Sequence, residues 1–366
     1  MPKSDQFWIS RCIEIAERGR GKVSPNPMVG SCVVKNGKLI SEGYHSVFGG
    51  PHAEVIALKK AGARAKGATI YVSLEPCSTY GKTAPCTEAI LKSGIKEVVI
   101  ASLDPNPRNY KKGISVLRKL GVKVKFGMFG DKVAEQNEAF FTYQTKKRPF
   151  VILKMAESLD GKITTFKHSR EWISGLPARE WTHGLREAVD AVIVGTNTIT
   201  IDNPRMTPYL SKSKRPKLPV RVVLDRELKL SKDLHVFGKD AETIVLTSKK
   251  HPVKKIAAYA TARRITVLPV KEKNKSLDVK EILKALYRIG ISSLMIEGGG
   301  EINASFLDAK AVDKVYMFVA PFILGGRTTV SSVEGRGIAA VKDAIRLRDV
   351  KTSKIGEDFL IEGYVK

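Results

Sequence analysis

Residues 51–86 read PHAEVIALKKAGARAKGATIYVSLEPCSTYGKTAPC, and this stretch decides the fold expected of the first half of the chain. Its first part, residues 52–65, has helical composition, and Pro51 suits a first helical turn, where its missing N–H is not needed. An apolar strand is expected at residues 68–74 and a second helix at residues 87–93. Alternation of helices and strands is typical of a layered α/β fold, whose chemistry usually lies where the strands end.

The same stretch carries the residues of a hydrolytic zinc site. His52, Cys77 and Cys86 offer one imidazole and two thiolates, which hold zinc and leave its fourth position open for water. Glu54 is the carboxylate expected to carry a proton from that water to a leaving amine. In the usual deaminase signature two residues separate the cysteines, whereas residues 78–85 separate them here.

Two other interpretations of these residues stay open. A structural zinc site normally has four protein ligands, but a fourth Cys or His at suitable spacing is missing from the sequence. Alternatively, two incidental cysteines accompany a surface histidine. The other two thiols, Cys12 and Cys32, are expected to be small buried residues of a helix and a strand. We therefore favour a catalytic site.

The α/β pattern extends to both sides of this stretch. Asn36-Gly37 is the strongest short hairpin signal in the chain, and Gly19 and Gly21 end a first amphipathic helix. The other elements expected in this half are helices at 6–18 and 114–120 and strands at 29–34, 39–44, 98–102 and 122–126.

A polar stretch at residues 143–149, YQTKKRP, marks a domain boundary. We expect a first domain at residues 1–146 and a second α/β domain at residues 147–366, since 366 residues exceed the usual size of one domain. In the second, strands are expected at 150–155, 191–195, 220–224, 243–247, 265–268, 293–297 and 314–319, and helices near 177–188, 279–289 and 301–309.

A glycine run stands out in the second half. Gly298-Gly299-Gly300 lies between a predicted strand and a predicted helix, where the backbone can approach a phosphate that the helix N-terminus stabilises. A tight strand-to-helix turn explains the run equally well. The usual G-x-G-x-x-G dinucleotide fingerprint is absent after the first strand of this half.

Composition narrows the protein class but not its partner. The formal net charge is +26, from 63 Lys and Arg against 37 Asp and Glu. Because these cations are spread along the chain, a solvated lysine-rich surface explains them as well as nucleic acid or phosphorylated ligands do. Four cysteines do not form a disulfide framework, and neither a membrane span nor a signal peptide is recognisable. We expect a cytoplasmic enzyme that binds no membrane.

Taken together, the motifs resemble those of the bifunctional riboflavin-biosynthesis deaminase–reductases, and the resemblance covers nearly the whole chain. It is carried by PNPMVG at 25–30, GYH at 43–45, PHAE at 51–54, EPCS at 75–78, GKTAPC at 81–86, DPNP at 104–107, SLDGK at 158–162, WIS at 172–174, DNP at 202–204 and EGGG at 297–300.

The resemblance implies two consecutive reactions, two folds and two cofactors. A cytidine-deaminase-like three-layer domain would use one Zn²⁺ to deaminate 2,5-diamino-6-(5-phosphoribosylamino)pyrimidin-4(3H)-one. A dihydrofolate-reductase-like α/β domain would use NADPH to reduce the ribosyl group of 5-amino-6-(5-phosphoribosylamino)uracil to ribityl. Homologous enzymes form homo-oligomers, and by analogy so would this one. Residues alone do not decide between NADPH and NADH, because too many cations are candidates for a 2′-phosphate partner.

The resemblance also implies site residues, and several of them have a simpler structural explanation. Lys82, on a glycine-bearing loop, would face the substrate phosphate, or it is one more solvated lysine. Asn26 could equally be a turn residue, His45 a surface residue, Arg186 a helix-surface residue and Trp172 a core residue. By position, substrate contacts are Asn26, His45, Lys82, Arg170, Arg186, Met206 and Glu297, and cofactor contacts are Ala156, Trp172, Thr198, Asp202, Gly298, Gly299 and Gly300.

Three positions depart from the family pattern. Thr79 and Ala84 stand where His and Pro are common, which affects binding of the pyrimidine. Tyr209 stands where an arginine is common, so phosphate binding in the reductase would fall to Arg205 or Lys212.

Two competing functions follow from these uncertainties. A deaminase of nucleic-acid bases would use the +26 charge, but no aromatic-rich basic stretch lies near the zinc motif. A deaminase with a degenerate, non-catalytic second half is supported mainly by Tyr209.

Overall fold

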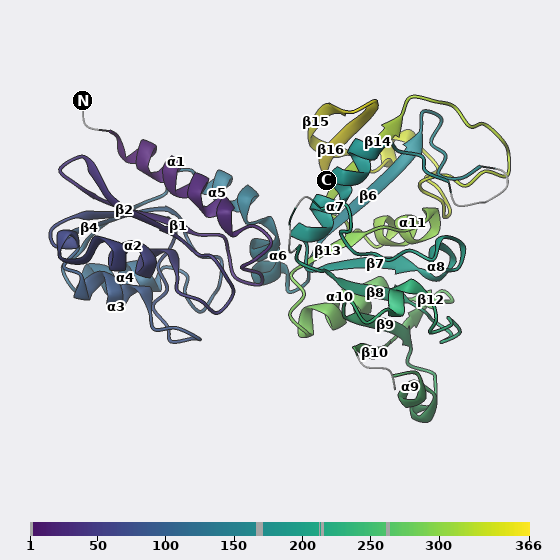
Figure 1. Ribbon diagram of the computed structural model, residues 1–366, viewed down its shortest axis with the longest axis horizontal. Coiled ribbons are helices and arrows are strands. Elements are labelled where there is room, and N and C mark those ends of the chain that lie inside the picture. The colour runs from purple at the N-terminus through teal and green to yellow at the C-terminus, as the bar shows by residue number, and fades with distance from the viewer. Residues whose placement is uncertain (1–2, 166–170, 212, 214–215, 261–263) are drawn as a thin grey trace. The chain divides into compact units, whose positions relative to one another are not determined.

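The computed structural model describes residues 3–165, 171–211, 213, 216–260 and 264–366. Its contacts divide the chain into two compact units, Met1–Lys147 and Arg148–Lys366, and each has its own sheet and core (Figure 1).

The first unit is built on a five-stranded sheet in the order β2-β1-β3-β4-β5, formed by described residues. The hairpin signal is confirmed: Asn36 and Gly37 both have positive φ and join antiparallel β1 and β2. From β3 onward the strands are parallel. The bounds are β1 Gly30–Lys35, β2 Lys38–Tyr44, β3 Thr69–Leu74, β4 Glu97–Ser102 and β5 Lys123–Phe126.

Helices cover both faces of this sheet, so the predicted three-layer α/β fold is confirmed. Alternate strand residues serve opposite faces: Cys32 packs with α1, whereas Val33 packs with α2. The first face carries α1 Asp5–Ala16, α5 Gly130–Gln136 and α6 Glu138–Lys146, and the second carries α2 Ala53–Ala61, α3 Cys86–Lys92 and α4 Lys112–Lys119.

The second unit holds a nine-stranded sheet of described residues, in the order β10-β9-β8-β7-β13-β6-β14-β16-β15. Strands from β10 to β14 are parallel, and β16 and β15 complete the sheet as an antiparallel hairpin. The bounds are β6 Phe150–Ser158, β7 Ala191–Gly195, β8 Val220–Leu224, β9 Thr243–Ser248, β10 Ile265–Val270, β13 Ser293–Ile296, β14 Lys314–Ala320, β15 Leu347–Ile355 and β16 Asp358–Val365. A separate small hairpin joins β11 Glu272–Lys273 to β12 Ser276–Leu277.

Helices pack on this second sheet too. Helices α10 and α11 bury apolar residues in the main core, and α7 packs through Ala178 against Phe318 and Leu360. Asp278 caps α10 by accepting from the backbone N–H of Lys280. The bounds are α7 Leu176–Ala188, α8 Thr196–Asp202, α9 Val253–Tyr259, α10 Val279–Arg288 and α11 Gly300–Asp308.

Several elements were not predicted, and two of them have a clear physical reason. Helix α8 has the sequence TNTITID, whose β-branched residues have low helix propensity. Strand β15 is almost entirely exposed, so it lacks apolar alternation. Helices α5, α6 and α9 and strands β11, β12 and β16 were also missed. The helix predicted from His52 begins one residue later, because the His52 backbone is extended and caps it.

Candidate functional site

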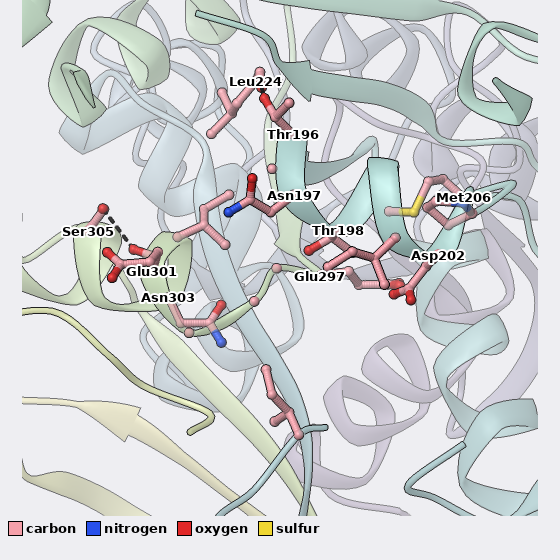
Figure 2. A pocket seen from close by; sticks show the side chains of 18 of the residues that line it. Thr196, Asn197, Thr198, Asp202, Met206, Leu224, Glu297, Glu301, Asn303 and Ser305 are labelled. Atoms are coloured by element: carbon pink, nitrogen blue, oxygen red, sulfur yellow. Dashed lines mark hydrogen bonds between the residues drawn. The ribbon is translucent and has the colours of Figure 1, made fainter. Parts of the chain in front are cut away.

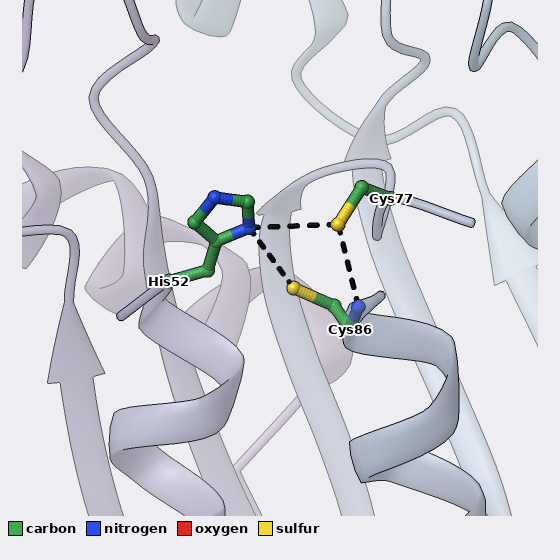
Figure 3. A group of neighbouring side chains, drawn as sticks. All are labelled: His52, Cys77 and Cys86. Atoms are coloured by element: carbon green, nitrogen blue, oxygen red, sulfur yellow. Dashed lines mark hydrogen bonds between the residues drawn. The ribbon is translucent and has the colours of Figure 1, made fainter. Parts of the chain in front are cut away.

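The three predicted metal ligands come from three different elements and meet at one point (Figure 3). His52 is the N-cap of α2, Cys86 is the first residue of α3, and Cys77 follows β3. The His52 Nδ1 atom lies 3.1 Å from Cys86 Sγ and 3.5 Å from Cys77 Sγ, and all three ligand atoms lie within 4.8 Å of one another.

This donor set fits zinc. Tetrahedral zinc with bonds of about 2.1 Å to nitrogen and 2.3 Å to sulfur holds those atoms about 3.6 Å apart, close to the separations found here. Among the described residues, the group that converges at this spacing contains three His and Cys ligands and no fourth. Three ligands with a free position are typical of a catalytic rather than a structural zinc site.

One of the two ligand thiols, Cys77, is favoured as a thiolate, whereas the hydrogen bond with Cys77 and burial raise the pKa of the Cys86 thiol. A hydrogen bond with Cys86, reinforced by His52, lowers the pKa of the Cys77 thiol to about 4 although burial opposes the shift. Glu54 lies in the first turn of α2 with 3% of its surface exposed, and this burial raises the pKa of its carboxyl. A buried carboxyl beside the ligands, and outside the ligand group, suits proton transfer.

Asn26 and His45 lie beside the metal ligands. The His45 ring is 5.3 Å from the His52 ring, its Nδ1 is 3.0 Å from the Pro51 carbonyl, and its Nε2 is 3.2 Å from Asn26 Nδ2. Since the carbonyl can only accept, Nδ1 carries the proton and Nε2 accepts from Asn26. His45 is 2% exposed, so its reading as a surface residue is wrong.

Lys82 stands at the exposed rim of this region. Its Nζ lies 3.9 Å from the centroid of the Phe48 ring, and its loop also carries exposed Thr79 and Ala84. The cation is therefore held by an aromatic face and remains open to solvent.

Sequence reasoning missed the support behind the cysteine loop. The Glu75 carboxylate accepts from the backbone N–H groups of Asp104 and Lys111, at 3.3 and 3.0 Å. Asn109 accepts from the backbone N–H of Ser78 at 2.9 Å and donates to Asp104 at 3.0 Å. The motifs EPCS and DPNP contain Glu75, Ser78 and Asp104, but the sequence did not predict a structural role for these residues.

The second unit contains a cavity of about 950 Å³ at the carboxyl ends of β6, β7, β8 and β13 (Figure 2). Apart from Arg170, which lies outside the described residues, every residue expected to contact reductase substrate or cofactor lines it. They are Ala156, Trp172, Arg186, Thr198, Asp202, Met206, Glu297, Gly298, Gly299 and Gly300.

A buried ion pair dominates one side of the cavity. Arg186 Nε and Nη2 donate to the two carboxylate oxygens of Glu297, at 2.7 and 2.5 Å, and Arg186 Nη1 donates to the Thr207 carbonyl at 3.1 Å. Although burial opposes ionisation of Glu297, Arg186 lowers the pKa of its carboxyl. Arg186 is therefore not a helix-surface residue. The reading of Trp172 as a core residue is also wrong, since it is 57% exposed.

Lys154 is another residue that sequence reasoning missed. It lines the cavity, and burial lowers the pKa of its amine to about 8 while Glu297 opposes that shift. The feature that could have revealed it is a charged lysine within the otherwise apolar strand sequence FVILKM.

Of the three positions that depart from the family pattern, Tyr209 lines this cavity. The centroid of its ring lies 4.3 Å from that of the His183 ring. Arg205 also lines it, whereas Lys212 lies outside the described residues.

Two glycines of the turn after β13 are required by packing within the protein itself. A Cβ on Gly298 would lie 1.7 Å from Ile302, and one on Gly300 would lie 2.4 Å from the Ser331 carbonyl, so neither position tolerates a side chain. Asn303 donates to the Ser332 carbonyl at 2.8 Å, and among the described residues its buried Oδ1 has no hydrogen-bond partner. A bound ligand with hydroxyl or amide donors would satisfy that acceptor.

Comparisons with known proteins match both units. Residues 149–361 match the family model of the RibD C-terminal domain, and residues 2–102 match that of the cytidine and deoxycytidylate deaminase zinc-binding region. The riboflavin biosynthesis protein RibD of Aquifex aeolicus is 40% identical over 98% of this chain and 97% of its own length.

Solved structures agree over the whole length. Acinetobacter baumannii RibD superposes with a TM-score of 0.90 at 31% identity, covering 99% of both chains. The Thermotoga maritima protein, named a diaminohydroxyphosphoribosylaminopyrimidine deaminase/5-amino-6-(5-phosphoribosylamino)uracil reductase, superposes with a TM-score of 0.84 at 37% identity and the same coverage.

Within the described residues, no helix combines the length and apolar character needed to cross a membrane. The zinc-binding region, the reductase domain and the full-length relatives lead to one conclusion: the chain belongs to the RibD family, the bifunctional zinc- and NADPH-dependent deaminase–reductases of riboflavin biosynthesis.

Proposed function

We propose that this chain deaminates 2,5-diamino-6-(5-phosphoribosylamino)pyrimidin-4(3H)-one and then reduces the ribosyl group of 5-amino-6-(5-phosphoribosylamino)uracil to ribityl. The observation that carries the proposal is the presence of both a three-ligand His–Cys–Cys site and a cavity of about 950 Å³ in a chain whose relatives share both units. The name of the Thermotoga maritima relative supplies the two substrates.

We assign deamination to residues 1–146 and reduction to residues 147–366. His52, Cys77 and Cys86 would hold the zinc, which when bound supplies a Lewis acid that makes water nucleophilic near neutral pH. Glu54 would take the proton of that water and deliver it to the departing ammonia, because its carboxyl lies beside the ligands and burial raises its pKa.

The substrate would be oriented by three further residues of this unit. The fixed Asn26–His45 pair would bind the pyrimidine beside the ligands. Lys82 would leave the Phe48 ring to meet the phosphate, since a charged partner outweighs a cation–π contact.

In the reductase, NADPH supplies the hydride, and the residues of the chain position the two reactants. Arg186, Met206 and Glu297 would contact the phosphoribosyl substrate, as would Arg170. Lys154 would add a positive charge beside Glu297. The cofactor would contact Ala156, Trp172, Thr198, Asp202 and the turn Gly298, Gly299 and Gly300.

We further propose a cytoplasmic homo-oligomer that acts on small molecules rather than nucleic acid. A reducing compartment would keep both ligand thiols available, and relatives of the same architecture provide the analogy for oligomerisation.

The test is an assay of the purified chain with the diaminopyrimidinone substrate, with and without NADPH. We expect ammonia release without cofactor, and NADPH oxidation only after substrate is added. Ammonia without NADPH oxidation would favour a non-catalytic second unit. Activity on oligonucleotides instead of either step would overturn the assignment.

A further inference from the structure

One wall of the reductase cavity is segment 203–211, which follows α8. Arg205, Met206 and Tyr209 line the cavity from this segment, and Figure 2 labels Met206. Its backbone includes two residues with positive φ, Asn203 at 41° and Met206 at 57°. Residues other than glycine keep such a conformation only where the surrounding structure holds them in it. The shape of this wall therefore depends on the contacts that segment 203–211 makes with its neighbours.

Helix α7 holds the segment from behind through two side chains one helical turn apart. Arg186 Nη1 donates to the Thr207 carbonyl at 3.1 Å, and the backbone N–H of Leu210 donates to His183 Nδ1 at 3.3 Å. Arg186 also pairs with Glu297 inside the cavity. His183 has no part in that ion pair, so its contact with the segment needs an explanation of its own.

His183 lies behind the cavity wall. It is 3% exposed, and it is not among the described residues that line the cavity. The centroid of its ring lies 4.3 Å from that of the Tyr209 ring at an interplanar angle of 74°, which is an edge-to-face contact. The His183 ring therefore supports the segment twice, at the backbone of Leu210 and at an aromatic side chain of the cavity lining.

The protonation state of His183 decides which hydrogen bond it makes. Burial, reinforced by the charge of Arg186, lowers the pKa of the ring to about 4, so the ring is neutral near pH 7 and has one acceptor nitrogen. Both ring nitrogens face donors, because Nε2 lies 3.4 Å from Arg186 Nη1. Since Nη1 has the Thr207 carbonyl as another acceptor, we assign the acceptor role to Nδ1 and its hydrogen bond to Leu210.

We propose that His183 is a positioning residue for the reductase substrate, which acts by holding Leu210 and the Tyr209 ring in the shape that the phosphoribosyl uracil meets. The inference rests on the proposed function in taking the cavity as the reductase site, with Met206 and Arg186 on its substrate side. It adds a buried residue of α7 that touches neither reactant. Loss of His183 should weaken binding of the substrate and leave hydride transfer in the bound complex intact.

The experiment is steady-state kinetics of the full-length, zinc-loaded chain with NADPH and 5-amino-6-(5-phosphoribosylamino)uracil. His183→Leu fills a similar volume without an acceptor, so the KM for the uracil substrate should rise at least about tenfold, because a buried N–H loses its partner. The kcat and the KM for NADPH should stay within about twofold of wild type, as expected when only substrate binding is lost. His183→Asn keeps an acceptor near the position of Nδ1 and should recover most of the substrate affinity.

Hydrogen exchange followed by mass spectrometry gives a readout that needs no substrate. Peptides that cover residues 206–211 should exchange at least about tenfold faster in His183→Leu than in wild type, and His183→Asn should restore their protection. Thr182→Val is the matched control, because Thr182 is the neighbouring buried residue of α7 and its hydroxyl donates to the Ala178 carbonyl. This control should change neither the exchange of these peptides nor either KM.

Several results would overturn the inference alone, in an enzyme that oxidises NADPH with this substrate. They are an unchanged substrate KM in His183→Leu, equal rises in the KM values of substrate and NADPH, a fall in kcat that His183→Asn does not restore, or a raised substrate KM without faster exchange. If the wild type oxidises no NADPH with this substrate, the proposed function of the unit fails, and the substrate role of His183 fails with it. Faster exchange in His183→Leu would then still show that His183 holds segment 203–211 in place.

Discussion

Glu297, directly after β13, accepts two hydrogen bonds from Arg186 on α7, so the carboxylate and the guanidinium hold each other inside the reductase cavity. Both side chains are nearly buried, at 14% and 12% exposure. Breaking such a pair by removing one charge leaves the other buried and unpaired.

Glu297→Gln should therefore lower the NADPH-dependent step by about a hundredfold, because Arg186 loses its charged partner and the pair no longer holds the substrate position. Ammonia release should stay unchanged, because the zinc ligands lie in the other unit. Parallel ammonia and NADPH assays on one preparation test this. An equal fall in both rates would indicate general unfolding instead.

The buried amine of Lys154 should make the reductase activity depend on pH. Burial lowers the pKa of its amine to about 8, so its positive charge disappears above that pH. Reductase kcat/KM should fall as pH rises through 8, and Lys154→Arg should move this fall to higher pH, since guanidinium stays charged. A profile that Lys154→Arg leaves in place would assign the fall to another group.

The lowered pKa of Lys154 also makes the stability of the folded protein depend on pH. An unfolded lysine has a pKa of about 10.4, so between pH 8 and 10.4 the unfolded chain binds more protons than the folded one. This group therefore makes the folded state more stable as pH rises through that window. Urea denaturation of wild type and Lys154→Met across the window should show a smaller rise in the variant.

Glu54→Gln should reduce deamination by a factor of about 10² to 10⁴, because it removes the proton carrier without removing a ligand. Metal analysis should still give about one zinc per chain. Loss of zinc in this variant would identify Glu54 as a ligand and contradict its assigned role.

Zinc removal should separate the two activities. A chelator strong enough to empty the His52, Cys77 and Cys86 site should abolish ammonia release, and added zinc should restore it. NADPH oxidation with the deaminated uracil substrate should persist throughout. Its loss on chelation would show that the reductase depends on the metal.

Asn109→Ala should weaken zinc binding by about tenfold, because it releases the Ser78 backbone next to Cys77 and leaves Asp104 without its side-chain donor. Competition with a chromogenic chelator measures this affinity. Ser93→Ala, which also removes a side-chain hydrogen bond but at the end of α3, serves as control. Equal affinities in the two variants would show that the cysteine loop holds its shape without Asn109.

Local chemistry made part of this molecule predictable. His52, Cys77 and Cys86 needed only their residue types and the strand-and-helix pattern around them. The Asn36-Gly37 turn was equally local, since its positive φ values favour those two residues. The reductase residues depended on resemblance, and the cavity contains all of them that the structure describes.

Contacts between distant segments could not be read from the sequence. Asn109 meets Ser78 across 31 positions, and Lys154 acquires its environment from Glu297 and Arg186 on other elements. Asp225, directly after β8, accepts from the backbone N–H groups of Lys229 and Leu230, and nothing in the sequence predicts this. In each case the packing of the whole unit determines which residues meet. The spacing of residue types along the sequence does not predict these contacts.

The last hairpin, β15 and β16, affects the tendency of the protein to aggregate. β15 closes the large sheet and leaves one row of backbone groups along its outer side, which is a template for pairing with another chain. Exposed Arg348, Lys351 and Lys354 line this strand. Two such strands brought edge to edge would face each other with an excess of positive charge, which opposes non-specific pairing at this border.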